Sequence, residues 1–340
     1  MSKTEKLSYP FAEKPSFGGL LEVSEGLFWL RVPIPFALDH INLWLLRDGD
    51  GWTIIDTGFF SAEVATIWER LLEEFCAGAP IKKIVVTHFH PDHVGMASWL
   101  VERTGAELWM SEREFLTVHR VCQPYSEREI TVRAIFFERF GLNEKQLASV
   151  VNARSSDVEG LPEAPVSYRR LVGGQTLSIN GENWNLFSFA GHSPEHICLH
   201  NAERNLLISG DQVLPSISPN ISVTFYEPQA NPLAEYLNSL SRLSELNEET
   251  LVLPSHGSVF QGLHRRIDQL EAGHQKQLDR LLEFCRQPRD GKEALEAMFG
   301  NRLSAFNLSL GVGEAQAHLN YLVAKRELKQ NDEFIPHYQR

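Results

Sequence analysis

The sequence predicts a layered α/β domain that is followed by a small helical domain. In the first 262 of the 340 residues, short apolar runs rich in β-branched and aromatic side chains alternate with helical segments. This alternation is typical of helices packed on the outside of a sheet core. After Gly257 the pattern changes to helices. We therefore place a layered domain at residues 1–262 and a helical domain at residues 263–340, which fits the length of the chain.

The first hundred or so residues predict five strands and two helices. Strands are expected at residues 20–26 and 27–35, and two apolar runs around Asp-Gly-Asp-Gly at 48–51 predict a hairpin. A helix is expected over 61–75 with Ser61 as its N-cap. A further strand at 81–87 precedes a helix at 94–105, which Gly105 closes.

Residues 111–165 form a mixed-charge insertion with helical character, interrupted at Pro124 and Gly141. Two interpretations are open. The segment is either a surface helical pair or a helical cap over a pocket, for which Phe136, Phe137 and Phe140 would supply an apolar lining.

The second half returns to strands and ends in helices. Strands are expected at residues 176–179, 184–190, 196–200, 205–210 and 250–254, with a helix at 231–246. Residues 263–287 have the spacing of a long amphipathic helix. The tail from Pro288 reads as a helical segment of winged-helix type and carries seven Lys/Arg against seven Asp/Glu. A wing that reads DNA should be basic, so we favour a packing or dimerisation role.

The charge and composition narrow the class of partner. The net charge of −12 gives no general attraction to nucleic acid or to anionic membranes. A local basic groove is still compatible with this net charge. The four cysteines form no CxxC pair, the start of the chain has no apolar signal segment, and no run reaches the ~20 apolar residues of a membrane span. We expect a cytoplasmic protein with a small-molecule substrate, no membrane partner, and homodimerisation left open.

A cluster of metal-capable side chains follows the strand at 81–87. His88, His90, Asp92 and His93 lie within six residues, and Pro91 interrupts any helix that would run back through them. The alternative is a solvated polar loop. Three further apolar β-rich runs, however, also end in one such side chain each, namely His192, Asp211 and His256.

These seven donors predict a metal centre at one end of the sheet core, because sites in layered α/β proteins gather at strand ends. Seven nitrogen and oxygen donors are too many for one tetrahedral zinc ion and suit two ions, with a carboxylate such as Asp211 able to bridge both. Imidazole and carboxylate together suit zinc, and iron or manganese are compatible with the same ligands.

The same stretches resemble a known family. THFHPDH (87–93), GHSPEH (191–196), SGD (209–211) and SHG (255–257) are similar, in order, to the metallo-β-lactamase superfamily of binuclear hydrolases. SGDQVLPSISPNI (209–221), PLAEYLNSL (232–240), GLHRRIDQLEAGH (262–274) and the C-terminal segment resemble more narrowly the beta-lactamase-like protein 2 branch. The resemblance implies an α/β fold of the four-layered αββα type, with a small winged-helix-like C-terminal domain.

The resemblance also implies roles for single residues. His88, His90 and His192 would bind one metal ion, Asp92, His93 and His256 a second, and Asp211 would bridge them. Asp56 matches a carboxylate that orients the site, although from the residues alone it reads equally well as a turn residue. Asp92 is our candidate for catalytic proton shuttle, and His196 and His40 are weaker candidates for donors to substrate oxygens. Lone buried histidines such as His196, His200 and His264 are more often structural.

At two positions the sequence differs from related families, and these differences narrow the type of reaction that we expect. Asp211 stands where the common zinc β-lactamases have cysteine, so antibiotic hydrolysis is not favoured. His90 stands where diiron oxidoreductases have glutamate, which favours hydrolysis. The leading hypothesis is a hydrolase with two Zn²⁺ ions that uses a metal-bridging hydroxide on a small ester, thioester or lactone. The alternatives are an endoribonuclease or phosphodiesterase of the same fold, a mononuclear iron sulfur dioxygenase, and a metal-free binding protein.

Overall fold

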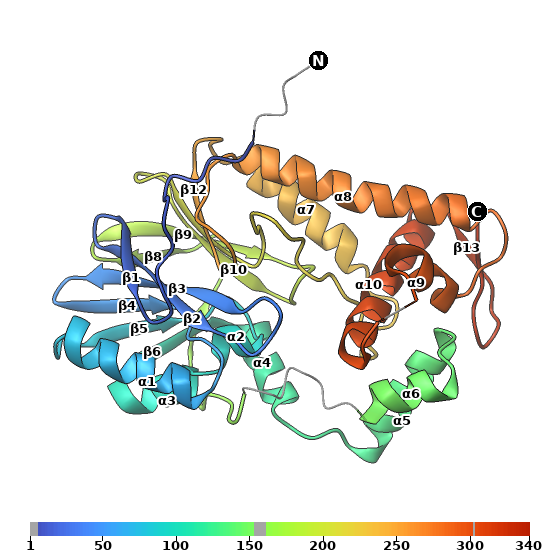
Figure 1. Ribbon diagram of the computed structural model, residues 1–340, viewed down its shortest axis with the longest axis horizontal. Coiled ribbons are helices and arrows are strands. Elements are labelled where there is room, and N and C mark those ends of the chain that lie inside the picture. Colours follow the sequence, from blue (N-terminus) through green and yellow to red (C-terminus); the bar gives the residue numbers. More distant parts are fainter. Residues whose placement is uncertain (1–5, 153–160, 302) are drawn as a thin grey trace.

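Two β-sheets form the centre of the molecule in the computed structural model, which describes residues 6–152, 161–301 and 303–340 (Figure 1). The first sheet contains, in this order, β1 (Leu20–Ser24), β2 (Leu27–Pro33), β3 (His40–Asp48), β4 (Gly51–Ile55), β5 (Ile81–Val85), β6 (Glu107–Ser111) and β7 (Arg169–Leu171). The second has the order β12-β11-β10-β9-β8 and contains β8 (Thr176–Ile179), β9 (Glu182–Phe189), β10 (His196–Asn201), β11 (Leu206–Gly210) and β12 (Leu251–Pro254).

Strand directions bring the chemically important strand ends to one edge. In the first sheet β4 and β5 are parallel neighbours, so the chain leaves both at the same edge. In the second sheet β9 and β11 are each antiparallel to β10, and β11 is parallel to β12. The chain therefore leaves β9, β11 and β12 in one direction, and the predicted metal-capable residues that follow these strands share one edge.

Alternating side chains divide the core into layers. Because successive side chains of a strand point to opposite faces, Ile54 joins the core under helices α1 (Ala62–Arg70) and α3 (Ala97–Thr104), whereas Ile55 faces the second sheet. In β10, Leu199 faces the first sheet and Cys198 joins the core under α7 (Pro232–Leu243) and α8 (Leu263–Phe284). The predicted order of helix, sheet, sheet and helix is confirmed (Figure 1).

Several local predictions are also confirmed, with one difference near the histidine cluster. The chain turns between β3 and β4 at the predicted hairpin, Ser61 accepts a hydrogen bond from Val64 N at the start of α1, and Gly105 ends α3 with a φ of 71°. The helix α1 continues as a π-helix over Leu71–Phe75. A separate short helix, α2 (Pro91–Val94), begins at the proline, so Asp92 and His93 project from its first turn.

The insertion forms α4 (Glu112–Val121), α5 (Glu127–Arg139) and α6 (Glu144–Asn152); its residues 153–160 lie outside the described part of the chain. Phe137 and Phe140 are buried in the core that contains the C-terminal helices, and Phe136 packs against the same core. The interpretation of these rings as a pocket lining is therefore wrong. Their apolar faces instead attach the insertion to the C-terminal helices (Figure 1).

The C-terminal segment contains α9 (Gly291–Phe299), α10 (Ala305–Ala324) and an antiparallel pair, β13 (Lys329–Gln330) with β14 (Tyr338–Gln339). Its apolar residues belong to the same core as α7 and α8. The helical segment is thus packed continuously onto the sandwich, and the boundary at residue 262 stays a prediction. Among the described residues, no helix combines the length and the apolar character that crossing a bilayer requires.

Replacing Asp48 by alanine is expected to destabilise the fold by about 3 kcal/mol at pH 7. The buried carboxylate accepts bonds from Thr53 Oγ1 (2.9 Å), Lys83 Nζ (2.6 Å) and Asn180 N (2.8 Å), and so links both sheets. Burial alone would raise the pKa of Asp48, but these bonds outweigh it and lower the pKa. The stabilisation is therefore present above the unfolded-state pKa near 3.9 and is lost as the pH falls through the lower native value.

Urea unfolding at several pH values checks this prediction. The difference in unfolding free energy between the wild type and Asp48→Ala should shrink in acid. Asp50→Ala is the matched control, because Asp50 pairs with Lys82 at 2.7 Å on the same turn but has an 84% exposed side chain. Its replacement should leave the unfolding free energy close to that of the wild type, because exposed ion pairs contribute little to stability. Equal losses for the two variants would contradict the role of Asp48.

Candidate metal centre

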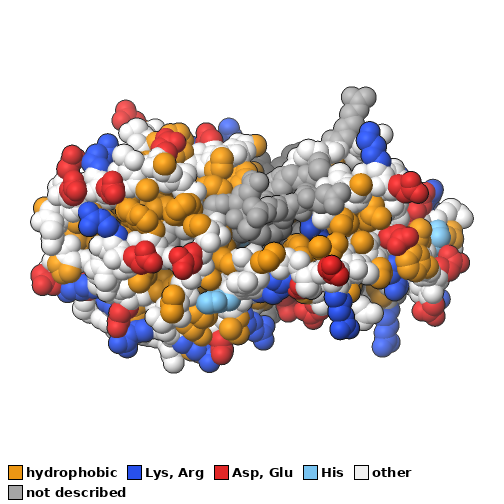
Figure 2. Space-filling model, turned by 90° about the horizontal axis from the view of Figure 1, so that it is seen from below, with side chains coloured by type: hydrophobic (Ala, Val, Ile, Leu, Met, Phe, Trp, Pro, Cys, Tyr) orange, Lys and Arg blue, Asp and Glu red, His pale blue; other side chains and the backbone are white. Residues whose placement is uncertain are grey.

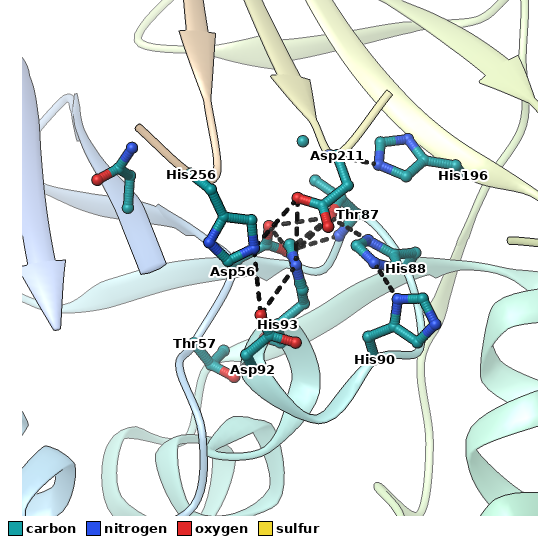
Figure 3. Close-up of polar contacts among 12 residues, drawn as sticks. Asp56, Thr57, Thr87, His88, His90, Asp92, His93, His196, Asp211 and His256 are labelled. Carbon is teal, nitrogen blue, oxygen red and sulfur yellow. Dashed lines mark hydrogen bonds and ion pairs between the residues drawn. The ribbon is translucent and has the colours of Figure 1, made fainter. Parts of the chain in front are cut away.

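All seven predicted donors meet at the shared strand edge. Figure 3 shows His88, His90, Asp92, His93, Asp211 and His256 facing one another there. His88 and His90 lie on the loop after β5, and Asp92 and His93 lie on α2. His192, Asp211 and His256 follow β9, β11 and β12. The sheet topology thus places side chains from four separate strand exits around one small space.

The donors fall into two groups, each of which could hold a metal ion. The first donor group consists of His88, His90, His192 and Asp211, and the second of Asp92, His93 and His256. Within each group the possible ligand atoms lie within 4.8 Å of one another. Asp211 also approaches the second group, because its Oδ1 is 3.4 Å from His256 Nε2 and 3.6 Å from His93 Nε2.

Two buried atoms at the centre of the site lack a hydrogen-bond partner. His93 Nε2 and Asp211 Oδ1 are both inaccessible to solvent, and neither forms a hydrogen bond within the described residues. Their mutual distance of 3.6 Å is too long for such a bond. A buried nitrogen and a buried carboxylate oxygen without partners would be costly. The donor set therefore fits a bound cation.

The outward ring nitrogens of four histidines are held by hydrogen bonds. His192 Nδ1 donates to Asn220 O at 2.9 Å, and His256 Nδ1 donates to His40 O at 2.7 Å. Since Nδ1 of each ring is used in this bond, Nε2 is the ring nitrogen that faces the site and is available to a metal ion. Such bonds fix the tautomer and the orientation of a metal-binding imidazole.

Asp56 orients the other two of these histidines. Its carboxylate accepts from His93 Nδ1 at 2.8 Å and from Thr87 N at 2.8 Å. It also accepts from Thr87 Oγ1, which in turn lies 3.0 Å from His88 Nδ1 and accepts its proton. Asp56 is buried and has a φ of 60°, a conformation that Asp tolerates better than most residues. The structure thus favours an orienting residue over a simple turn residue.

The electrostatic character differs between the two groups. Burial, followed by the neighbouring imidazoles, holds the pKa of His88 well below its usual value and lowers that of His90 to about 3. Burial acts in the same direction on His256, but Asp211 and Asp92 outweigh it and raise its pKa to about 10. The imidazoles of His88 and His90 are therefore neutral, as metal binding requires.

Two weaker candidates have structural roles. His196 is buried, and its Nε2 accepts a hydrogen bond from Asp211 N at 3.1 Å, so it cannot donate to a substrate oxygen from there. His40 Nδ1 is 2.5 Å from Asp39 Oδ1 and its Nε2 accepts from Gly257 N. The interpretation of both rings as substrate donors is wrong: His196 supports the backbone of Asp211, and His40 supports His256 through its carbonyl oxygen.

One buried carboxylate near the site escaped the sequence analysis. Glu114, on α4, accepts from Phe89 N (2.9 Å), Ser193 Oγ (2.6 Å) and Glu195 N (2.6 Å). It thereby joins the loop that carries His88 and His90 to the loop that carries His192. Burial raises the pKa of Glu114 to about 7 despite these bonds. In the sequence it is one of many acidic residues on an amphipathic helix, and no local pattern marks it.

Comparison with known proteins agrees with this geometry. Residues 37–256 match the Metallo-beta-lactamase superfamily, and residues 278–339 match the Metallo-beta-lactamase-like, C-terminal domain. The chain therefore belongs to the metallo-beta-lactamase superfamily. Its fold and donor cluster define it as a metal-dependent hydrolase.

Three relatives cover between 70% and 98% of the chain. A crystal structure of a beta-lactamase domain protein from Burkholderia ambifaria is 40% identical, with a TM-score of 0.91 and 98% coverage of both chains. The probable metallo-hydrolase YqjP of Bacillus subtilis is 26% identical over 90% of this chain and 94% of its own. The human acyl-coenzyme A thioesterase MBLAC2 is 25% identical over 70% of this chain and 80% of its own.

Proposed function

We propose that the protein is a binuclear zinc hydrolase that cleaves a thioester. The observation that carries the binuclear centre is the position of Asp211. Its Oδ2 lies 3.4 Å from His192 Nε2 in the first donor group, and its Oδ1 lies 3.4 Å from His256 Nε2 in the second. One carboxylate therefore supplies a different oxygen to each group, as a bridging ligand does.

The spacing of the donors supports zinc. Two ligands bound to one zinc ion at about 2.0–2.2 Å and at tetrahedral angles lie roughly 3.3–3.6 Å apart. The Nε2 atoms of His88 and His192 are 3.3 Å apart, and His256 Nε2 is 3.3 Å from Asp92 Oδ2. One pair is closer, since His88 Nε2 and His90 Nδ1 are 2.8 Å apart. The chain thus presents donors at spacings that suit two ions.

Zinc ions at such a site can lower the pKa of bound water to about 7 and polarise a carbonyl group. The protein's own contribution is to orient the side chains that bind the metal ions and to transfer a proton. Asp92 is suited to the second task, because its side chain is 16% exposed and faces the site from the first turn of α2. It would take a proton from the attacking water and return it to the leaving group.

The choice of a thioester rests on the relative with that activity, the human acyl-coenzyme A thioesterase, which matches 70% of this chain. The charge of the molecule fits a small-molecule substrate better than RNA. On the face seen in Figure 2, basic and acidic side chains are interspersed and no continuous basic patch is visible. Cytoplasmic location and homodimerisation stay predictions.

Metal analysis combined with a substrate panel tests the proposal. The purified protein should bind two equivalents of zinc and release free thiol from acyl-coenzyme A substrates, which a thiol-reactive dye detects. Chelation should abolish thiol release, and added zinc should restore it. A zinc-loaded protein that leaves a broad range of acyl chain lengths intact would contradict the thioesterase proposal. One bound iron with oxygen consumption would instead establish the dioxygenase alternative.

A further inference from the structure

The loop that follows Asp211, residues 212–230, is attached to the C-terminal helices. Arg266 on α8 donates through Nε to Leu214 O and through Nη2 to Ile217 O at 2.8 Å. Asn320 on α10 donates to Ala230 O at 2.8 Å. The loop that begins at a predicted metal ligand is therefore held largely by residues outside the two sheets.

The middle of this loop contacts α10 so closely that a side chain would not fit between them. Val223 N donates to Gly313 O at 3.0 Å. A Cβ atom at Gly313 would lie 2.8 Å from the Ser222 side chain and 2.9 Å from Val223 O. These distances are shorter than real Cβ contacts, so the glycine is required for the close approach. The loop and the helix thus form a rigid contact around Asn220.

Asn220 connects α10 to the first donor group. Its backbone oxygen accepts from His192 Nδ1 at 2.9 Å, while its side-chain Nδ2 donates to Glu314 Oε2 at 3.0 Å. Ser222 Oγ donates to Asn220 Oδ1, so both ends of the Asn220 amide are bonded. Burial raises the pKa of Glu314 to about 7 although the bond from Asn220 opposes this. Glu314 lies on α10, 94 residues from Asn220 in the sequence.

A second chain of hydrogen bonds joins the same loop to α8 and α10. His318 Nδ1 must donate to Glu314 O, which leaves its Nε2 to accept from His274 Nδ1 at 3.2 Å. His274 Nε2 then accepts from Ser218 Oγ at 3.3 Å. Every link therefore has one donor and one acceptor when both imidazoles are neutral. These hydrogen bonds, from Ser218 through His274 and His318 to Glu314 O, hold the helical turn that carries Glu314 in place.

We propose that Asn220 and Glu314 are positioning residues for His192, which makes the C-terminal helical domain part of the support of the metal centre. The proposal rests on the proposed metal centre. If Asn220 moved, its carbonyl would no longer hold the Nδ1 proton of His192, and the Nε2 lone pair would lose its direction toward Asp211 and His88. Partners of this kind typically change metal affinity by 10–100-fold when they are removed.

Zinc affinity, measured by competition with a chromophoric chelator, tests the proposal. Glu314→Leu should lower the affinity for one of the two zinc ions by about tenfold. This is the lower end of that range, because Glu314 acts through Asn220. Glu314→Gln retains a carbonyl oxygen that can accept from Asn220, so its affinity should stay close to that of the wild type. Asn220→Ala retains the backbone carbonyl that binds His192 but loses the side-chain amide, and it should lower the affinity for the same zinc ion.

Gln316→Leu is the matched control. Gln316 lies on the same helix, and its Nε2 donates to Asn320 Oδ1 and Tyr338 Oη, away from residues 218–223. It should leave both zinc affinities unchanged. Wild-type affinity in folded Glu314→Leu or Asn220→Ala, or an equal loss in Gln316→Leu, would overturn the proposal. Since the readout is zinc binding, a wild-type protein that binds two zinc ions without cleaving thioesters would contradict only the proposed substrate.

Discussion

Asp211→Ala is expected to lower kcat/KM for the substrate thioester by at least about a thousandfold, or roughly 4 kcal/mol of transition-state stabilisation. The reason is that, in the proposed binuclear centre, Asp211 would supply one ligand atom to each ion, so the variant would remove both at once. Asp211 Oδ2 faces His192 and Oδ1 faces His256, both at 3.4 Å. No single replacement among the other predicted ligands would affect both groups in this way.

Steady-state kinetics and zinc content check this result together. The variant should bind fewer than two equivalents of zinc, and the remaining activity should not recover when zinc is added in excess. Asp268→Ala, on the exposed face of α8, serves as a control that removes one carboxylate belonging to neither donor group. Activity of Asp211→Ala within about tenfold of the wild type would rule out an essential bridging carboxylate.

The second large effect is expected at Asp56. Asp56→Asn preserves the size of the side chain and tolerates the φ of 60°, so the fold should be retained. An amide, however, has one accepting oxygen and one donating nitrogen. If the oxygen keeps the bond from Thr87 N, the amide nitrogen faces His93 Nδ1. His93 must then carry its proton on Nε2, which points into the second donor group.

The expected result is a 10–100-fold loss of affinity for one zinc ion, with a comparable loss of activity. Thermal unfolding of the metal-free proteins separates this effect from a general loss of stability. Asp39→Asn is a close chemical match, because Asp39 also has a positive φ, of 59°, and also contacts a histidine. Its side chain is 67% exposed, so its replacement should change zinc affinity little. Unaltered zinc binding by Asp56→Asn would show that the tautomer of His93 does not depend on Asp56.

The sequence predicts the sandwich and the donor cluster well because both depend on local patterns. The alternation of strands and helices indicates a layered α/β domain, the family resemblance implies the four-layered sandwich, and the predicted donors come shortly after apolar β-rich runs. His192, for example, comes three residues after the end of β9, and Asp211 comes directly after β11. Strand ends in layered folds meet at an edge. The position of each donor after a strand therefore predicts that residues far apart in the chain lie close together in the structure.

The supporting residues could not be predicted in this way, since their partners are set by tertiary packing. Glu114 bonds Ser193 across 79 residues, and Asn220 bonds Glu314 across 94 residues. The helical insertion shows a related limit. An apolar stripe with Phe137 indicates that one face of a helix is buried, but it does not indicate that the C-terminal helices cover it. His274 lies at helical spacing on the buried face of α8, and this spacing alone suggests only a core residue.

A crystal structure of the zinc-loaded protein, with anomalous scattering measured on both sides of the zinc absorption edge, tests the central claim most directly. Two anomalous peaks are predicted. One should be surrounded by His88, His90, His192 and Asp211, and the other by Asp92, His93, His256 and the second oxygen of Asp211. A single peak, or two peaks with Asp211 bound to neither or only one of them, would contradict a binuclear centre joined by this carboxylate.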